Sequence, residues 1–315
     1  MSLARPCRKF DTASRFLYNY QPSTNKQTMT QPTISPDTTL GYVHLTVTNL
    51  DRSLAFYRES LGFQLHRRDG DTAALGAGRA DLLRLTENPR ARRVSRTTGL
   101  YHFAILVPGR VELAQVLRRI AETQTMVQGF ADHGVSEAIY LPDPDGNGIE
   151  MYRDRPRAEW PIRNGELAMV TDPLDTHGLL RELVGLSEPW AGLPAGTVLG
   201  HMHLHVSNLN RAELFYKNII GFELMQHFGG SAAFLSAGGY HHHLGLNIWN
   251  GVGAPQPPPD AVGLRCYVIE LPAQADVDAI ADRARAADVP LTEQPDGLLL
   301  RDPAGNGVVI KTRNA

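Results

Sequence analysis

The chain of 315 residues has little of several features that would point to particular classes of protein. Its two cysteines, Cys7 and Cys266, are too few for a disulfide framework, which favours a reducing cytoplasm. Lys and Arg number 31 against 33 Asp and Glu, so the net charge of -2 gives no signature of nucleic-acid or anionic-membrane binding. No apolar run approaches the roughly 20 residues of a membrane-spanning helix. We therefore expect a soluble, cytoplasmic protein that binds neither nucleic acid nor membrane.

Composition and length indicate a globular protein of more than one domain. Hydrophobic residues make up 42% and charged residues 20% of the sequence, as in typical folded proteins, and 315 residues exceed one ordinary domain. Residues 1–39 differ from the rest, with five Lys or Arg, two Asp and no helical or strand period. This composition fits a transit peptide, an unfolded tail or a reading that starts upstream of Met29. We expect a disordered N-terminal tail over residues 1–39.

An internal repeat organises the rest of the chain. Residues 41–65 match residues 200–224 at about half of their positions. The sequence DPDGNGIEM at 143–151 matches DPAGNGVVI at 302–310 with the same spacing between the copies. The repeating unit is therefore as long as a domain and too long for a solenoid repeat.

The repeat predicts two domains of the same build. The expected boundaries are 40–155 for the first domain, 156–198 for a linker with one short helix, and 199–314 for the second domain. Within each domain, a strand pattern, an amphipathic helix pattern and three short strands occur twice in succession. The prediction is an α+β fold of four βαβββ modules.

This layout resembles the vicinal oxygen chelate superfamily, which includes glyoxalase I, bleomycin-resistance proteins and type I extradiol ring-cleavage dioxygenases. The resemblance implies that the two modules of each half pair into a glyoxalase/bleomycin-resistance/dioxygenase-type cup. In that family, metal ligands lie on the first strand of each module and on the last strand of the second. Carried onto this sequence, those positions are His44, His102 and Glu150, which implies a metal site in the first domain.

These three residues are chemically suited to one metal ion. Two neutral imidazoles and a carboxylate leave coordination positions open, an arrangement that suits non-haem Fe(II) and O2 chemistry. A lone histidine in an apolar strand is usually a core residue, but here three separate strands each place a ligand type at the required position. We therefore expect a mononuclear Fe(II) site with O2 as co-substrate, and Mn(II) is the alternative metal.

The segment from His133 to Glu150 resembles the signature of extradiol dioxygenases. It runs from the histidine through an aliphatic-Tyr pair at Tyr140 and an Asp-Pro-Asp-Gly turn to the ligand glutamate. Ala131 departs from the signature, which prefers Gly, Asn, Thr, Ile or Val two residues before the histidine, although a small side chain is kept. The resemblance implies that His133 donates a hydrogen bond to bound oxygen and that Tyr140 stabilises the substrate oxygen. These two are the expected catalytic residues.

The second half differs at the ligand positions, where the repeat places His203, Cys266 and Val309. Valine cannot coordinate a metal, so we expect the second cup to be vestigial. The three histidines at 241–243 occupy a strand on which extradiol enzymes carry an acid/base histidine, so this residue and the metal triad fall in different halves. His203 and His242 are therefore a second candidate site, with a hydrogen-bonded polar layer as the alternative.

The function that we predict is extradiol (meta) cleavage of catechol or a substituted catechol with O2, which makes a small aromatic molecule the expected partner. One alternative is a glyoxalase-type metal-dependent isomerase or lyase, which is disfavoured because Arg84 lies near the place where that family has another carboxylate. Another is a non-enzymatic module that binds an aromatic antibiotic or metabolite, which would leave the triad without a role. The sequence leaves open the ring substituents and assembly into a homo-oligomer.

Overall fold

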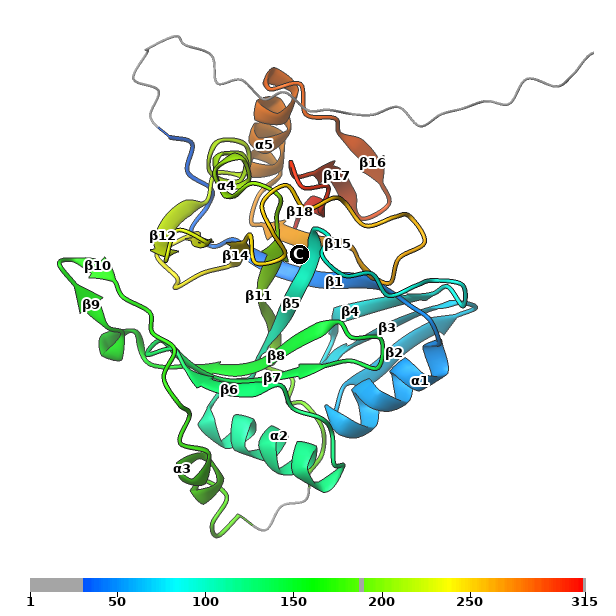
Figure 1. Cartoon of the computed structure of the whole chain (residues 1–315), viewed down its shortest axis with the longest axis vertical. Coiled ribbons are helices and arrows are strands. Elements are labelled where there is room, and N and C mark those ends of the chain that lie inside the picture. The colour runs from blue at the N-terminus through cyan, green and yellow to red at the C-terminus, as the bar shows by residue number, and fades with distance from the viewer. Residues whose placement is uncertain (1–30, 187–189, 314–315) are drawn as a thin grey trace, which may run out of the picture.

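The computed structural model describes residues 31–186 and 190–313, which form two curved eight-stranded sheets with helices on their outer sides (Figure 1). The order of a strand, a helix and three strands occurs four times along this region. The expected α+β fold of four βαβββ modules is therefore confirmed. We number the modules 1 to 4 in chain order.

The four modules have equivalent elements. Module 1 consists of β1 (Thr39–Val47), α1 (Leu50–Ala55) with a π-helical turn (Phe56–Ser60), β2 (Gln64–Asp69), β3 (Thr72–Ala77) and β4 (Ala80–Glu87). Module 2 consists of β5 (Gly99–Leu106), α2 (Arg110–Glu122), β6 (Gly129–Asp132), β7 (Ser136–Pro142) and β8 (Gly148–Asp154). Module 3 consists of β11 (Val198–His205), α4 (Leu209–Phe215) with a π-helical turn (Tyr216–Ile220), β12 (Glu223–Phe228), β13 (Ala232–Ser236) and β14 (Leu244–Asn247). Module 4 consists of β15 (Gly263–Leu271), α5 (Gln274–Ala286), β16 (Thr292–Gln294), β17 (Gly297–Arg301) and β18 (Gly307–Thr312).

Each sheet combines modules from opposite halves of the chain. One has the strand order β16-β17-β18-β15-β1-β4-β3-β2 and joins modules 1 and 4; we call it the outer-module cup. The other has the order β12-β13-β14-β11-β5-β8-β7-β6 and joins modules 2 and 3; we call it the inner-module cup. The expected pairing of the two modules within each half is therefore not the pairing of the structure.

The expected and observed pairings of the modules differ because every module offers the same free edge on its first strand. β1 pairs antiparallel with β15, and β11 pairs antiparallel with β5, with register shifts at corresponding places in the two pairs. Pairing within a half and pairing across the halves satisfy the same kind of backbone hydrogen bonds. A repeated sequence thus specifies the edges that must pair, but not which copy meets which.

Strand alternation separates a core face from a cup face. On β5, Phe103 and Ile105 are buried in the main hydrophobic core, whereas His102 lines a cavity in the inner-module cup. On β11, Met202 and Leu204 are buried in the same core. Successive side chains of a strand point to opposite faces, so the alternating pattern in the sequence places the polar residues of these strands on the concave side.

Both copies of the sequence D-P-x-G-N-G form the same buried turn. The Asp143 carboxylate accepts hydrogen bonds from the backbone N–H groups of Asp145 and Asn147, both at 2.8 Å. It also accepts a hydrogen bond from the hydroxyl of Tyr57 in module 1 at 3.0 Å. Asp302 makes the corresponding bonds before β18. The turn thereby fixes where the last strand of a module begins.

The segments outside the modules also pack on them. Ile34 is buried and its N–H donates to the Gly221 carbonyl at 2.9 Å, so the expected disordered tail does not extend to this residue. The rest of the expected tail, residues 1–30, lies outside the described residues. The connector between the halves contains a 3-10 turn (Arg157–Glu159), β9 (Ile162–Arg163), β10 (Glu166–Leu167) and α3 (Thr176–Arg181). The helix α3 confirms the short helix expected in the linker.

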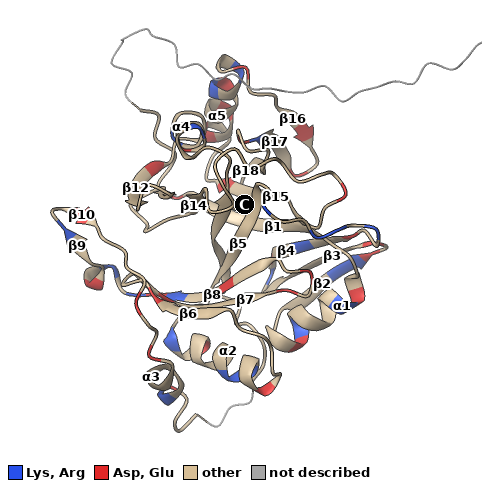
Figure 2. Ribbon diagram, viewed as in Figure 1, with Lys and Arg blue, Asp and Glu red and all other residues tan. Residues whose placement is uncertain are grey.

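The helices cover the outer sides of the sheets and carry charges of both signs (Figure 2). The two longest, α2 and α5, have 13 residues each, with a buried apolar face toward the sheets. Within the described ranges, no helix is long and apolar enough to cross a membrane.

Candidate metal centre and active site

Three buried side chains on neighbouring strands of the inner-module cup bring their ligand atoms together. They are His102 on β5, Glu150 on β8 and His201 on β11. The Oε2 atom of Glu150 lies 3.0 Å from the Nε2 of His102 and 3.0 Å from the Nε2 of His201. The two Nε2 atoms are 3.3 Å apart. Among the described residues, this is the one such group of three that could hold a metal ion.

The distances fit one face of a metal coordination shell. Ligand atoms at about 2.1 Å from a divalent metal and at right angles to one another are separated by about 3.0 Å. The three separations in the protein have this size, because both imidazoles direct their Nε2 at the same carboxylate oxygen. A metal held by this face keeps the opposite positions open for exchangeable ligands.

The electrostatics of the group favour the forms that bind a metal. Burial lowers the pKa of His102, although its hydrogen bond with Glu150 opposes the shift. Burial alone would raise the pKa of Glu150, but His201 and His102 outweigh it and hold that pKa well below its usual range. Both shifts favour a neutral imidazole and an ionised carboxylate, which are the states in which these side chains act as ligands.

The three ligand residues lie in the wall of a cavity of about 270 Å³. The expected catalytic pair, His133 and Tyr140, lines the same cavity. The Nε2 of His133 is 2.7 Å from the Tyr140 hydroxyl, and Tyr140 on β7 stands directly opposite Glu150 on β8. The structure therefore brings His102, Glu150, His133 and Tyr140 into one site.

The connector fixes the tautomer of His133. The Nδ1 of this ring is 2.8 Å from the carbonyl oxygen of Val170, which can only accept a hydrogen bond. Nδ1 therefore carries a proton and donates it. In the neutral ring Nε2 then has a free lone pair, and it accepts the hydrogen bond of the Tyr140 hydroxyl. Burial raises the pKa of Tyr140 well above its usual range, so this hydroxyl keeps its proton.

The second candidate pair, His203 and His242, lines the same cavity rather than a site of its own. Strand β11 places His203 opposite His102, and the ring centroid of His242 lies 4.1 Å from that of His201. Burial lowers the pKa of His203 and of His242 well below the usual range. His102 and Glu150 of the first half therefore meet His203 and His242 of the second half, because modules 2 and 3 share one cup.

The expected grouping of His44 with His102 and Glu150 is not the one that the structure forms. Strand β1, which carries His44, lies in the other sheet, and β11 is the neighbour of β5. His201 on β11 therefore meets His102 and Glu150 in place of His44. In the repeat, His201 corresponds to Tyr42 and not to His44, and the two positions share one face of the strand.

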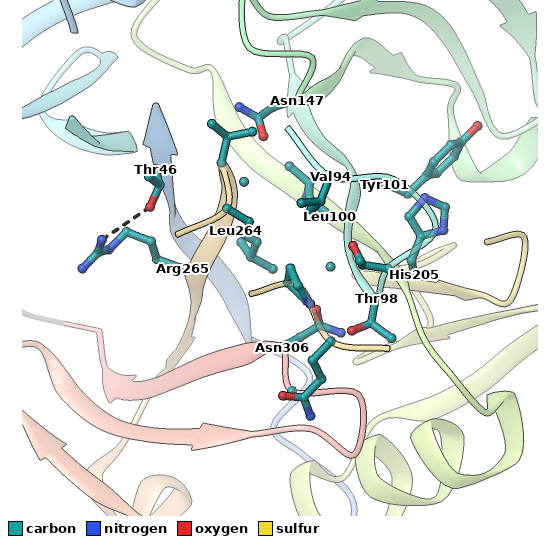
Figure 3. A pocket seen from close by; sticks show the side chains of 18 of the residues that line it. Thr46, Val94, Thr98, Leu100, Tyr101, Asn147, His205, Leu264, Arg265 and Asn306 are labelled. Carbon is teal, nitrogen blue, oxygen red and sulfur yellow. Dashed lines mark hydrogen bonds between the residues drawn. The ribbon is translucent and has the colours of Figure 1, made fainter. Parts of the chain in front are cut away.

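His44 instead lines a larger cavity of about 840 Å³ where the two cups meet (Figure 3). Figure 3 shows Thr46 and Arg265 on one side of this cavity and Tyr101 on the other. The Nε2 of His44 is 2.8 Å from the Thr86 hydroxyl. Burial, and next the charge of Arg265, lowers the pKa of His44 to about 4. The same positive charge opposes the binding of a cation at this histidine.

The outer-module cup has no ligand set at the corresponding positions. These positions hold Tyr42, Cys266 and Val309, whose side chains form a small buried cluster. The guanidinium of Arg84 lies 3.8 Å from the centre of the Tyr42 ring, and the Tyr42 hydroxyl donates to Asp296 at 2.8 Å. The cup without metal ligands is therefore built from modules 1 and 4, and not from the second half as expected.

A signal for His201 is present in the sequence. The run HMHLH on β11 places His201, His203 and His205 on one strand face. His201 is not among the expected ligands, because the second half is expected to form a cup of its own. The register of β11 against β5, which sets His203 opposite His102, is a contact between halves that strand periodicity alone does not contain.

Comparisons with known proteins agree with the repeat. The sequence model of the Glyoxalase/Bleomycin resistance protein/Dioxygenase superfamily matches residues 39–151 and 198–310. A protein of Bacillus subtilis (strain 168) named catechol-2,3-dioxygenase is 46% identical over 281 residues, which cover 88% of this chain and 98% of that protein. A lactoylglutathione lyase of Neisseria meningitidis serogroup A is 29% identical over 125 residues, which cover 37% of this chain and 91% of that protein.

Solved structures share the fold at low sequence identity. Glyoxalase I of Zea mays aligns with a TM-score of 0.53 at 20% identity, over 87% of this chain and 92% of that chain. A Bacillus subtilis protein described as a candidate dioxygenase aligns with a TM-score of 0.58 at 13% identity, over 91% of this chain and 87% of that chain. At these identities the likeness supports the fold and no particular activity.

Proposed function

The chain belongs to the glyoxalase/bleomycin resistance protein/dioxygenase superfamily, and from that premise we propose that it is an extradiol dioxygenase. Its substrate would be catechol or a substituted catechol, with O2 as co-substrate and one metal ion held by His102, Glu150 and His201. The observation that carries the proposal is the convergence of these three ligands in a cavity that also contains the His133–Tyr140 pair. The name of the Bacillus relative agrees with it.

Fe(II) is the metal that we propose, with Mn(II) as the alternative. Two imidazoles and one carboxylate on one face are the ligand set of non-haem Fe(II) oxygenases. When bound, a redox-active ion supplies the exchange of electrons between the aromatic ring and O2. The three ligand residues are at most 5% exposed, so the protein leaves the centre accessible mainly from the cavity.

Tyr140 and His133 are proposed to act on protons of the substrate. Tyr140 faces Glu150, so a substrate oxygen close to the triad would lie within reach of the Tyr140 hydroxyl. The Nε2 of His133 is the atom that can accept a proton, because Nδ1 is held by the Val170 carbonyl. Groups that transfer protons in this way typically contribute about 10²–10⁴-fold to the rate.

His203 and His242 are proposed as additional bases in the same cavity. Both rings are buried and their lowered pKa values keep them neutral, so each has a lone pair available near neutral pH. The Nε2 of His203 is buried and has no hydrogen-bond partner within the part of the chain that the structure describes. A catechol hydroxyl is the kind of donor that would satisfy such an atom.

A glyoxalase-type isomerase is the second candidate, favoured by the lactoylglutathione lyase that matches 37% of this chain. Resemblance to glyoxalase I implies a further carboxylate ligand. Over residues 31–186 and 190–313, Glu150 is the one carboxylate in the metal-binding group. A ligand set with two histidines and a single carboxylate supports the dioxygenase in preference to the isomerase.

Anaerobic loading with Fe(II), followed by addition of catechol and air, tests the proposal. We expect one iron per chain, consumption of one O2 per catechol and a yellow ring-cleavage product. A matched Glu150→Gln variant should lose the iron and the product while keeping its circular-dichroism spectrum. Metal binding with glutathione-dependent isomerase activity and no yellow product would favour the second candidate. A protein that shows neither metal binding nor either activity would contradict both candidates.

A further inference from the structure

A four-residue segment of the connector closes the open side of the inner-module cup. Strands β6 and β12 are the two edges of this sheet. At the β6 edge, Asp172 and Asp132 exchange backbone hydrogen bonds of 2.8 and 2.9 Å. At the β12 edge, the Gln226 side chain accepts a hydrogen bond from the Met169 N–H at 2.8 Å and donates one to the Met169 carbonyl at 3.3 Å. We call residues 169–172 the strap; the β9–β10 hairpin that precedes it lies beside β12 (Figure 1).

The strap forms part of the wall of the 270 Å³ cavity. Met169, Val170 and Thr171 line this cavity, and Met169 is only 9% exposed. The N–H of Val170 donates to the His133 carbonyl at 3.1 Å, and its carbonyl holds the Nδ1 of His133 at 2.8 Å. The strap therefore contacts both the space for the substrate and one member of the catalytic pair.

Aromatic side chains surround the rest of the cavity opening. Tyr101, Phe130, Phe228 and Trp249 are 40%, 41%, 43% and 46% exposed, and all four line this cavity. Isolated exposed apolar side chains are common on proteins, but several large ones around one opening mark a surface that binds an apolar molecule. We call these four residues the aromatic rim.

The described residues of the cavity wall offer no Lys or Arg to a negatively charged ring substituent. Among its described lining residues there is no Lys or Arg, and Glu150 is the one residue with an acidic side chain. A substrate carboxylate that enters this cavity would lose its hydration without forming an ion pair with Lys or Arg, which is unfavourable. A volume of about 270 Å³ lies just below the range of pockets for drug-sized ligands, so it suits one aromatic ring with a short substituent.

We propose that the strap and the aromatic rim select catechols with a short, uncharged, apolar substituent and exclude catechols whose substituent carries a carboxylate. The inference rests on the proposed ring-cleaving function and assigns its substrate class. Met169 is the strap residue that faces the substituent. Gln226 is a positioning residue, because it acts on the substrate through the backbone of Met169.

The first test compares kcat/KM of the iron-loaded protein for 4-ethylcatechol and 3,4-dihydroxyphenylacetate, which are similar in size but differ in charge. We expect a preference of about 100-fold or more for the neutral compound, since the site has no cation for the carboxylate. Equal values, or a preference for the carboxylate, would overturn the inference and leave ring cleavage standing. Cleavage of neither compound would contradict the proposed function itself.

The second test reverses the selection with Met169→Lys. A cation in the strap should shift the ratio of the two kcat/KM values toward the carboxylate compound by about tenfold or more, the effect of one charge-assisted hydrogen bond. The control is Met126→Lys, because Met126 is 68% exposed and does not line the cavity. It should leave the ratio unchanged. An unchanged ratio in folded, iron-loaded Met169→Lys would show that the strap does not face the substituent.

The third test detaches the strap with Gln226→Met, which keeps the length of the side chain and removes both hydrogen bonds. The preference for the neutral compound should decrease, whereas a purely structural role would lower kcat/KM for both compounds by the same factor. Gln274→Met is the matched control: the Gln274 amide donates to Asp278 at 2.9 Å and accepts from Thr312 at 2.8 Å, but in module 4. A ratio of the two kcat/KM values that is unaffected by Gln226→Met would contradict the positioning role of Gln226.

Discussion

At the scale of single residues, the candidate metal centre depends on which histidine reaches Glu150. His201 and His102 both do so at 3.0 Å, and all three side chains are buried. His44 has the Thr86 hydroxyl as its neighbour and lies in the other sheet. Histidines on the equivalent strands β1 and β11 thus have different chemical surroundings, and substitution of each should distinguish a metal ligand from a histidine outside the metal-binding group.

His201→Ala should abolish stoichiometric metal binding, whereas His44→Ala should leave it unchanged. Removal of His201 deletes one of three ligands, but His44 contributes no atom to the group. Iron per chain, measured by atomic emission after anaerobic loading and gel filtration, checks both variants side by side. Loss of iron in His44→Ala with full occupancy in His201→Ala would contradict the assignment and support the triad expected from the sequence.

His133→Ala and Tyr140→Phe should keep the metal and lose turnover. Neither side chain belongs to the metal-binding group, and the 2.7 Å contact between them is the expected path of the proton. The loss in kcat should be about 10²–10⁴-fold, the usual contribution of acid–base groups. The control is His227→Ala, because this histidine is exposed and pairs with Glu213 outside the cavity. Turnover like that of the unaltered protein in both active-site variants would remove the proposed role.

At the scale of elements, the two D-P-x-G-N-G turns have the same structure, but the strands that follow them carry different kinds of residue. Asp143 and Asp302 each accept hydrogen bonds from two backbone N–H groups, an asparagine side chain and a buried tyrosine. The first turn begins β8, which carries Glu150, and the second begins β18, which carries Val309. The same local structure therefore positions a proposed metal ligand in one cup and an apolar core residue in the other.

Asp143→Ala and Asp302→Ala should destabilise the protein by similar amounts, about 3 kcal/mol each, because several buried donors lose their acceptor. Urea unfolding of the metal-free protein measures this cost. Iron affinity should fall only in Asp143→Ala, since only β8 places a ligand. Equal weakening of iron binding in both variants would show that general destabilisation, and not the position of Glu150, controls the metal centre.

At the scale of the whole molecule, the expected arrangements that the structure reproduces are those contained within one module. The strand and helix periods fix each βαβββ unit, and the segment from His102 to Glu150, with His133 and Tyr140 between, lies entirely in module 2. These residues would be neighbours whichever module paired with theirs. The third member of the proposed ligand set, His201, comes from module 3, and its position depends on the pairing of β5 with β11. Four nearly equivalent free edges leave that choice undetermined in a single repeated sequence.

The crossed pairing predicts that neither half alone can form the metal centre. A fragment ending at residue 186 contains His102 and Glu150 but lacks His201, and both β1 and β5 lose the strand that pairs with their free edge. Exposed edges favour aggregation, so the two halves should be co-expressed as separate chains rather than mixed after purification.

We expect the co-expressed halves to purify as one complex that binds one iron and cleaves catechol, because β1–β15 and β5–β11 hold the halves together without the covalent connection. His201→Ala in the C-terminal chain should abolish iron binding by the complex, although Glu150 lies on the other chain. Gel filtration with iron analysis measures both results. If the N-terminal half alone held one iron as tightly as the intact protein, the ligands would all come from the first half, and the crossed arrangement could not be the origin of the site.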